Sequence, residues 1–271
     1  MEPMRLNKYL SEQGICSRRE ADRLIEAGKI TIDGRKAEMG EKVTGQERIV
    51  CDGKPAGRSA GGKKAKPVLL AVNKPRGIVC TTSDKDRAPN VVDLIQYPAR
   101  VYPVGRLDKD SEGLLLMTNQ GELANEIMHA GNLHEKEYLV TVDQPFNAAF
   151  IKKMQEGVEL KELGVTTRPC RVEATGPKSF RIVLTQGLNR QIRRMCEELG
   201  YHVVTLKRVR IMNILLGKLN TGDFRRVTPK ELEELEYQLA RAREMREEAS
   251  ELRETGLRGD IHEPGEPDSE A

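Results

Sequence analysis

Tryptophan is absent from this chain, and aromatic residues make up only 4% of its 271 positions, so its cores must be built mainly from Leu, Ile and Val. No apolar run approaches the length that a membrane-spanning helix needs. The opening segment, MEPMRLNKYL, also lacks the apolar stretch of a signal peptide. These absences predict a cytoplasmic protein with no membrane partner.

Cysteine is equally sparse, with five widely scattered residues and no CxxC pair. An odd number of scattered cysteines argues against a disulfide framework, and the missing CxxC argues against a zinc site. We therefore expect a reducing compartment and no structural metal.

The net charge of +3 hides a strong division along the chain. Residues 231–271 carry 14 acidic and 5 basic side chains, whereas residues 1–230 carry 40 basic and 28 acidic ones. A folded body with that excess of positive charge attracts polyanions, of which nucleic acid is the commonest. A solvated surface with incidental Lys and Arg would give the same counts, so charge alone does not decide between the two.

Residues 4–58 have the pattern of a small domain built from helices and a short hairpin. An amphipathic helix contains Leu6 and ends at Gly14, and Ser17-Arg18-Arg19-Glu20 is a capping box that opens a second helix. Ile30-Thr31-Ile32 followed by Asp33-Gly34 predicts a strand that enters a tight hairpin. Residues 59–67 then form a flexible basic linker, because the stretch KPAGRSAGGKKAKP at residues 54–67 has too few apolar residues to pack.

Residues 68–232 alternate strands with helices, and strands outnumber helices, which predicts an α+β domain on a mostly antiparallel sheet. A last helix over residues 228–254 opens with a second capping box, Thr228-Pro229-Lys230-Glu231. Residues 255–271 are rich in Gly, Pro and acid, so we expect a disordered acidic tail. The expected strands are Val68–Asn73, Tyr138–Val142 and Phe180–Thr185, and the expected helices are Gly121–His129, Phe146–Glu156 and Asn189–Leu199, the last capped by Asn189.

The densest charged segment is GRLDKDSEG at Gly105–Gly113, which runs directly into the apolar residues Leu114–Met117. A carboxylate placed where a loop meets a buried strand can be held rigidly while it faces a cleft. A polar turn that merely leads into a buried strand would have the same pattern, and this segment alone favours that simpler interpretation. The alternation of its acids with Lys and Ser fits no calcium or zinc spacing, so no metal site is predicted.

Two further segments carry candidate side chains. Arg190, Arg193 and Arg194 lie within about one helical turn of each other in QGLNRQIRRM. Such a cluster is ordinarily an RNA-facing basic patch, and a buried Arg aimed at Asp108 is the more specific hypothesis. Tyr138, in KEYLV, lies on a predicted strand, where a tyrosine is more often part of the core than of an active site.

Four segments in order resemble the successive motifs of bacterial pseudouridine synthases that modify a single ribosomal uridine: KPRG at Lys74–Gly77, GRLDKDSEGLLL at Gly105–Leu116, EKEYLV at Glu135–Val140 and LTQGLNRQIRRM at Leu184–Met195. Residues 5–43 resemble the small RNA-binding module shared with ribosomal small-subunit protein four, and the whole resemblance covers about residues 4–232. The segments HEKEYLVTVDQPF and RIMN are most similar to the F-type subfamily of large-subunit pseudouridine synthases, although the B-type and E-type subfamilies share most motifs.

The resemblance implies specific roles. It makes Asp108 the catalytic carboxylate, Arg193 its partner, and Tyr138 the ring that stacks on the target base and assists proton transfer. Arg106 would fill the gap left by the flipped uridine. Further RNA contacts are expected from Lys74, Arg190, Arg194, Arg18 and Arg19.

The implied reaction converts a uridine in 23S rRNA to pseudouridine, breaking the C1′–N1 bond and joining C1′ to C5. It involves no redox change and no external group, so no cofactor is expected. A carboxylate can trap an oxocarbenium-like sugar or act as a base at C2′, and the sequence leaves both routes open. We expect a monomer that acts on 23S rRNA or a precursor ribosomal particle, with small-subunit rRNA or tRNA as alternatives.

Two other classes of protein are weaker hypotheses. A non-enzymatic RNA-binding protein of ribosome assembly would use the basic module but would have no reason to keep an ordered set of Asp, Tyr and Arg. A glycoside hydrolase with Asp108 and Glu112 as its acid pair would need sugar-stacking aromatics, and the chain has no Trp.

Overall fold

The computed structural model describes residues 2–56, 66–81, 88–129 and 133–256, with side chains up to residue 251. Most of the linker predicted at residues 59–67 lies outside these ranges, as does the predicted acidic tail beyond residue 256. The elements are β1 (Met4–Arg5), α1 (Leu6–Glu12), α2 (Arg18–Glu26), β2 (Ile30–Ile32), β3 (Arg35–Lys36), β4 (Lys42–Val43), β5 (Ile49–Cys51), β6 (Lys54–Ala56), β7 (Leu69–Lys74), α3 (Val91–Ile95), β8 (Tyr102–Val104), β9 (Glu112–Thr118), α4 (Gly121–Met128), β10 (Lys136–Val142), α5 (Ala148–Glu156), β11 (Glu159–Leu160), η3 (Lys161–Leu163), β12 (Val165–Thr166), β13 (Arg171–Gly176), β14 (Ser179–Leu184), α6 (Gln191–Glu198), β15 (Val203–Ile211), β16 (Ile214–Leu215), β17 (Phe224–Arg226) and α7 (Pro229–Gly256).

The N-terminal module has a hydrophobic core of its own, in which α1 and α2 pack with the four-stranded sheet β3-β2-β5-β6. The predicted start of α2 is confirmed, because the Ser17 hydroxyl accepts a hydrogen bond from the Glu20 amide at 3.1 Å. The predicted hairpin is confirmed as well: Asp33 and Gly34 have φ of 50° and 88°, the left-handed values that a tight turn between β2 and β3 requires.

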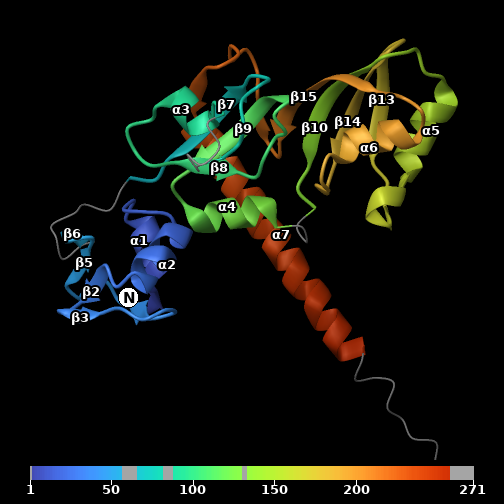
Figure 1. Ribbon diagram of the computed structural model, residues 1–271. Coiled ribbons are helices and arrows are strands. Elements are labelled where there is room, and N and C mark those ends of the chain that lie inside the picture. The colour runs from blue at the N-terminus through green and yellow to red at the C-terminus, as the bar shows by residue number, and fades with distance from the viewer. Residues whose placement is uncertain (1, 57–65, 82–87, 130–132, 257–271) are drawn as a thin grey trace, which may run out of the picture.

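A second, nine-stranded sheet organises the rest of the described chain (Figure 1). Its main path is β13-β14-β10-β15-β9-β7-β17, with β16 paired to β15 and β8 paired to β9. Its pairings are antiparallel except that of β15 with β9. The predicted α+β fold with a mostly antiparallel sheet is therefore confirmed.

The two halves of this sheet are buried differently. On one half, β10, β13 and β14 pack one face against α5 and α6, in a core that includes Phe150, Phe180 and Met195. On the other half, β7 and β9 are covered on both faces, by α4 and α7 on one side and by α3 on the other. The parallel pairing of β15 with β9 joins the halves, so the chain segments at this junction are held by both cores.

The structure differs from the expected elements at several places, and two of these differences affect the site described below. The nine-residue strand β15 was not predicted, because its Lys and Arg residues conceal the apolar alternation of a strand. The expected cap at Asn189 is wrong: α6 begins at Gln191 after Arg190, which adopts a left-handed conformation with φ of 51°. The Gln191 side chain instead accepts a hydrogen bond from the Leu188 amide at 3.1 Å.

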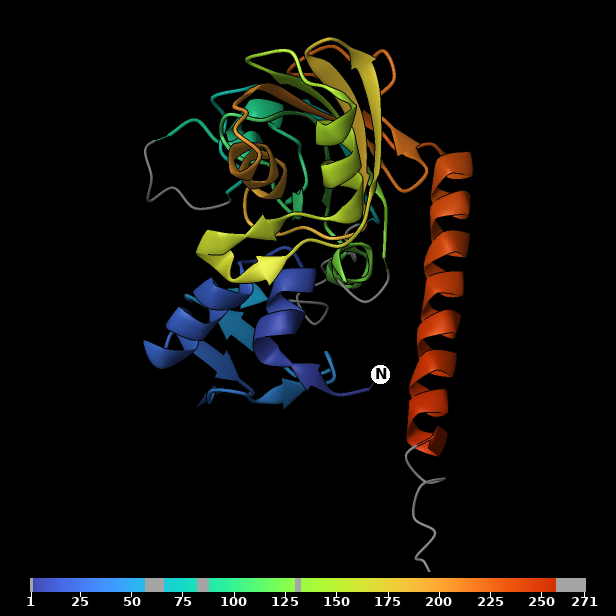
Figure 2. The same ribbon diagram turned by 90° about the vertical axis from the view of Figure 1, so that its right-hand side faces the viewer.

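Figure 2 shows α7 running alongside the sheet and extending past it. Its first turns bury Leu235 and Leu239 against β7 and β9. The predicted capping box is confirmed, since the Glu231 carboxylate accepts from the Thr228 amide at 2.9 Å and the Thr228 hydroxyl accepts from the Glu231 amide at 3.3 Å. Within the described ranges, no helix combines the length and apolar character needed to cross a membrane.

Candidate active site

Buried groups on the core side of the Asp108 loop hold this loop in place. Leu107 is buried in the core between β7 and α3, and the Gly77 amide donates to the Lys109 carbonyl at 2.7 Å. Lys74, at the end of β7, donates from Nζ to the carbonyls of Ser111 at 2.8 Å and Pro75 at 2.9 Å. The Asp108 side chain itself is 35% exposed. This loop therefore presents a partly buried carboxylate on a rigid support.

The expectation that Lys74 contacts the substrate is wrong in this structure, because its side chain is fully buried. Burial lowers the pKa of the Lys74 ammonium, and the negative charge of the Asp108 carboxylate acts in the opposite direction. The reason lies in its position on β7, a strand whose residues are all buried. Lys74 supports the backbone beside Asp108 from inside the domain.

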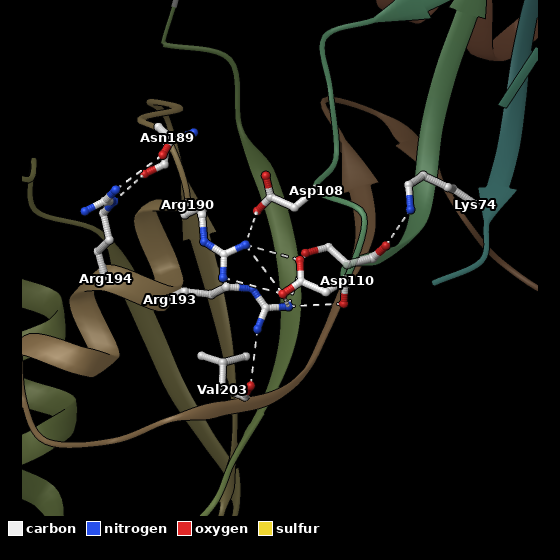
Figure 3. A network of polar contacts seen from close by, with 9 residues as sticks. Lys74, Asp108, Asp110, Asn189, Arg190, Arg193, Arg194 and Val203 are labelled. Carbon is white, nitrogen blue, oxygen red and sulfur yellow. Dashed lines mark hydrogen bonds and ion pairs between the residues drawn. The ribbon is translucent and has the colours of Figure 1, made fainter. Parts of the chain in front are cut away.

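Two arginines approach the loop from the start of α6 (Figure 3). Arg193 places Nη2 at 3.2 Å from Asp110 Oδ2 and at 3.1 Å from the Asp110 carbonyl, while its Nη1 donates to the Val203 carbonyl at 3.2 Å. Arg190 lies further out, with Nη1 at 3.3 Å from Asp110 Oδ1 and 3.9 Å from Asp108 Oδ2. The prediction that Arg193 pairs with Asp108 is therefore wrong: its carboxylate partner is Asp110.

The backbone explains this exchange of partners. Arg193 is in the first turn of α6 on the side that faces the core, and its side chain is only 7% exposed. Arg190 precedes the helix in a left-handed conformation, and its side chain is 40% exposed. Burial acts to raise the pKa of Asp110, but the Arg193 and Arg190 guanidiniums outweigh it and hold that pKa below its ordinary value.

Arg194 is directed elsewhere. Its guanidinium forms an ion pair with Glu162 on η3, and its Nε donates to the Asn189 carbonyl at 3.1 Å. It borders a different hollow, together with Glu162, Glu197 and Glu198. The structure does not bring Arg194 to Asp108.

A cleft of about 410 Å³ opens in front of Asp108. Arg106 is exposed at its edge, and the half-buried Tyr138 of β10 lies opposite Arg208 of β15 in the strand pairing. The Arg208 guanidinium carbon is 6.0 Å from the centre of the Tyr138 ring. The lining residues are Gly105, Arg106, Leu107, Asp108, Ser111, Met128, His129, His134, Lys136, Tyr138, Leu184, Thr185, Gln186, Gly187, Leu188, Asn189, Arg190, Gln191, Ile192, Leu206 and Arg208.

The sequence interpretation missed Lys136 and Arg208 in this lining. A signal was present: Lys136 lies on the same strand face as the buried Val140, and Arg208 lies on the same strand face as the buried Leu206. A charged residue at an inward position of a half-buried strand is unusual, because burying a charge costs free energy.

The N-terminal module reaches the edge of the cleft. Arg18, exposed on α2, lines a second hollow of about 360 Å³ together with Arg100 and Tyr102. Gly105 and Met128 border both this hollow and the cleft. A solvent-exposed ion pair of 2.7 Å joins Lys8 of the module to Glu122 of α4. Arg19 is also exposed on α2.

Comparison with known proteins identifies both parts. Residues 68–198 match the family model for RNA pseudouridylate synthase, and residues 4–49 match that for the S4 domain. A crystal structure of a pseudouridylate synthase has a TM-score of 0.63 and 27% identity, covering 86% of this chain and 99% of that one.

Several characterised relatives are similar over most of their length. The dual-specificity RNA pseudouridine synthases RluF of Salmonella typhi and Escherichia coli strain K12 are each 51% identical, over 85% and 86% of this chain and 78% of theirs. Ribosomal large subunit pseudouridine synthase B of Bacillus subtilis strain 168 is 35% identical, over 85% of this chain and 95% of its own. This chain belongs to the RNA pseudouridine synthase family.

Proposed function

We propose that this protein isomerises a specific uridine of 23S rRNA to pseudouridine, with Asp108 as the catalytic carboxylate. The observation that carries the proposal is the position of Asp108, which is supported by buried groups on one side and open to a cleft on the other. The volume of the cleft falls in the range of roughly 300–1,000 Å³ that is usual for small-molecule sites, so a single flipped nucleotide is a suitable occupant.

The reaction requires the target base to leave its stack, at a cost of a few kcal/mol. Tyr138 offers an aromatic face inside the cleft for stacking, and the exposed Arg106 is available to fill the vacated space in the RNA. Arg193 acts as a positioning residue in this proposal, because it holds Asp110 and the backbone beyond Asp108.

The RNA is proposed to extend from the cleft toward the module. Arg190 at the cleft, with Arg18 and Arg19 on α2, would contact phosphates along this path. Relatives at 51% identity bear the name dual-specificity synthase, and we extend the proposal to a second RNA substrate that presents the same local structure. The protein would act in the cytoplasm as a monomer, on rRNA or a precursor particle.

The direct test uses 23S rRNA transcripts labelled with tritium at C5 of uridine, because joining C5 to C1′ releases that label. Wild-type protein should release tritium in proportion to the pseudouridine formed. Asp108→Asn keeps the shape of the side chain but removes its charge, so its single-turnover rate should fall at least about 10³-fold while RNA affinity stays within a few-fold.

Glu112→Gln is the matched control, since Glu112 belongs to the same charged segment but does not line the cleft. It should turn over like the wild type. Normal turnover by Asp108→Asn would remove Asp108 from the catalytic role, and no tritium release by the wild type on any ribosomal transcript would overturn the proposed activity.

A further inference from the structure

The proposed roles leave two cations of the cleft unused. Lys136 and Arg208 both line the cleft on the sheet face that carries Tyr138. Lys136 precedes Tyr138 by two residues on β10, so the two side chains point to the same face. Arg208 lies directly opposite Tyr138 in the pairing of β10 with β15. Three neighbouring positions of one sheet face thus border the same space.

Arg208 is buried and incompletely satisfied. It is 4% exposed, and its Nε donates to the Leu114 carbonyl of β9 at 2.7 Å. Its Nη2 has no hydrogen-bond partner among the described residues. A buried guanidinium nitrogen without an acceptor carries a free-energy cost. An acceptor supplied by a bound molecule would remove that cost.

Lys136 adds a second positive charge next to the first. The hydrogen bond found for its ammonium, to the His134 carbonyl, is long at 3.4 Å. Burial lowers the pKa of Lys136, and the positive charge of Arg208 lowers it further. Neither cation takes part in the ion pairs formed within the described part of the chain. The floor of the cleft therefore favours a ligand group that carries or develops negative charge.

Phosphate is the less suitable candidate for this position. The exposed arginines Arg106 and Arg190 already border the cleft, where a phosphate can remain partly hydrated. Arg208 is instead in the buried floor beside the Tyr138 ring, where a base stacked on that ring would lie. Uracil presents two carbonyl oxygens, O2 and O4, that accept hydrogen bonds.

We infer that Lys136 and Arg208 are catalytic residues that bind the carbonyl oxygens of the flipped uracil and stabilise the negative charge on the base as its glycosidic bond breaks. This inference rests on the proposed function. The C1′–N1 bond breaks with its electron pair going to N1, which makes uracil a monoanion whose charge is shared by N1, O2 and O4. C1′ becomes electron-deficient in front of the Asp108 carboxylate. When C5 bonds to C1′, C5 loses its proton and N1 gains one, so nothing is consumed.

The test compares RNA containing uridine with RNA containing 5-fluorouridine at the target position. Fluorine withdraws electrons and makes the departing base a weaker base, so its departure depends less on cations. The variant is Lys136→Met, which removes the charge and keeps much of the length of the side chain. Single-turnover loss of the starting nucleoside is measured at saturating RNA for both substrates, by chromatography after nuclease digestion.

Lys136→Met should slow the uridine substrate by about 10²–10³-fold, the usual effect of removing one preorganised charge stabiliser. The 5-fluorouridine substrate should be slowed at least about tenfold less, and the dissociation constant for RNA should stay within about twofold. Arg208→Lys, which keeps a charge but loses the fork, should show the same pattern more weakly. Lys207→Met is the matched control: Lys207 lies next to Arg208 on β15, opposite the exposed Leu139, and should behave like the wild type.

Equal slowing of both substrates by Lys136→Met would overturn the inference, because a residue that only shapes the cleft is insensitive to the leaving group. A large loss of RNA affinity with normal turnover at saturation would also overturn it, by assigning Lys136 to phosphate. In either case wild-type turnover shows that the proposed function stands. An inactive wild-type protein would instead refute the proposed function itself.

Discussion

Positive charge has two different uses in the two domains of this protein. Behind Asp108, the buried Lys74 and Arg193 donate to backbone carbonyls at distances of 2.8–3.2 Å, and each bond has a defined direction. On α2 of the module, Arg18 and Arg19 are exposed to solvent. Buried cations of the first kind fix geometry, whereas exposed ones of the second kind provide a screened, less directional attraction for phosphate. Substitutions in the two places should therefore fail in different ways.

Arg193→Met should have the largest effect. It removes the donor to the Val203 and Asp110 carbonyls, and hydrogen bonds from a charged group contribute about 1.5–3 kcal/mol each. The lost ion pair adds less, because the Asp110 side chain is 40% exposed and keeps Arg190 as a partner. Turnover at saturating RNA should fall by more than about 10²-fold, because the backbone beside Asp108 loses its support. Thermal unfolding and single-turnover rates measure the two effects.

Arg193→Lys and Arg190→Met are the comparisons for that substitution. Lysine cannot reach the Val203 carbonyl and Asp110 with a fixed fork, so Arg193→Lys should restore only part of the activity. Arg190→Met, at a side chain that is 40% exposed, should leave stability nearly unchanged and weaken RNA binding more than turnover. A fully active, stable Arg193→Lys protein would mean that Arg193 supplies charge alone.

Lys74→Met should have an intermediate effect. The two carbonyls that Lys74 satisfies would lose a donor, but the cost of burying an ammonium would also disappear, so stability should fall by only about 1–3 kcal/mol. We expect turnover to fall roughly tenfold with RNA affinity unchanged, a split that distinguishes internal support from substrate contact. Reduced affinity in a filter-binding titration would show instead that Lys74 reaches the RNA.

The combined change Arg18→Gln and Arg19→Gln should have the smallest effect on catalysis. Each lost phosphate contact lowers the slope of log affinity against log salt by about 0.7–0.9, so the double variant should lose about 1.4–1.8. Turnover at saturating RNA should match the wild type. Deleting residues 4–49 removes Arg18 and Arg19 together with the rest of the module and is an independent test. If the shortened protein keeps the salt slope of the wild type, the module does not bind RNA.

Local chemistry made much of the fold predictable. The Ser17 cap, the capping box at Thr228 and the Asp33-Gly34 turn depend on side chains within four residues of one another, and all three are present. The motif order also identified Asp108 and Tyr138 as neighbours of one cleft. Those features need no knowledge of distant segments.

What could not be predicted depends on contacts across long sequence separations. Arg193 meets Asp110 rather than Asp108 because of how α6 packs, and Lys74 is buried because β7 is covered on both faces. Arg208 enters the cleft only because β15 pairs with both β10 and β9. Strand pairing over about 70–100 residues is set by the packing of the whole domain, which short motifs do not encode.

The position of β15 also has a consequence for how the chain folds during its synthesis. The strands of the N-terminal module pair within the first 56 residues, so that module can form soon after it leaves the ribosome. The larger sheet stays in two unconnected halves until Val203–Ile211 is available to join β9 to β10. Loop-closure entropy makes such distant pairings slow relative to local ones. During translation, the part proposed to hold RNA is therefore complete before the part proposed to modify it.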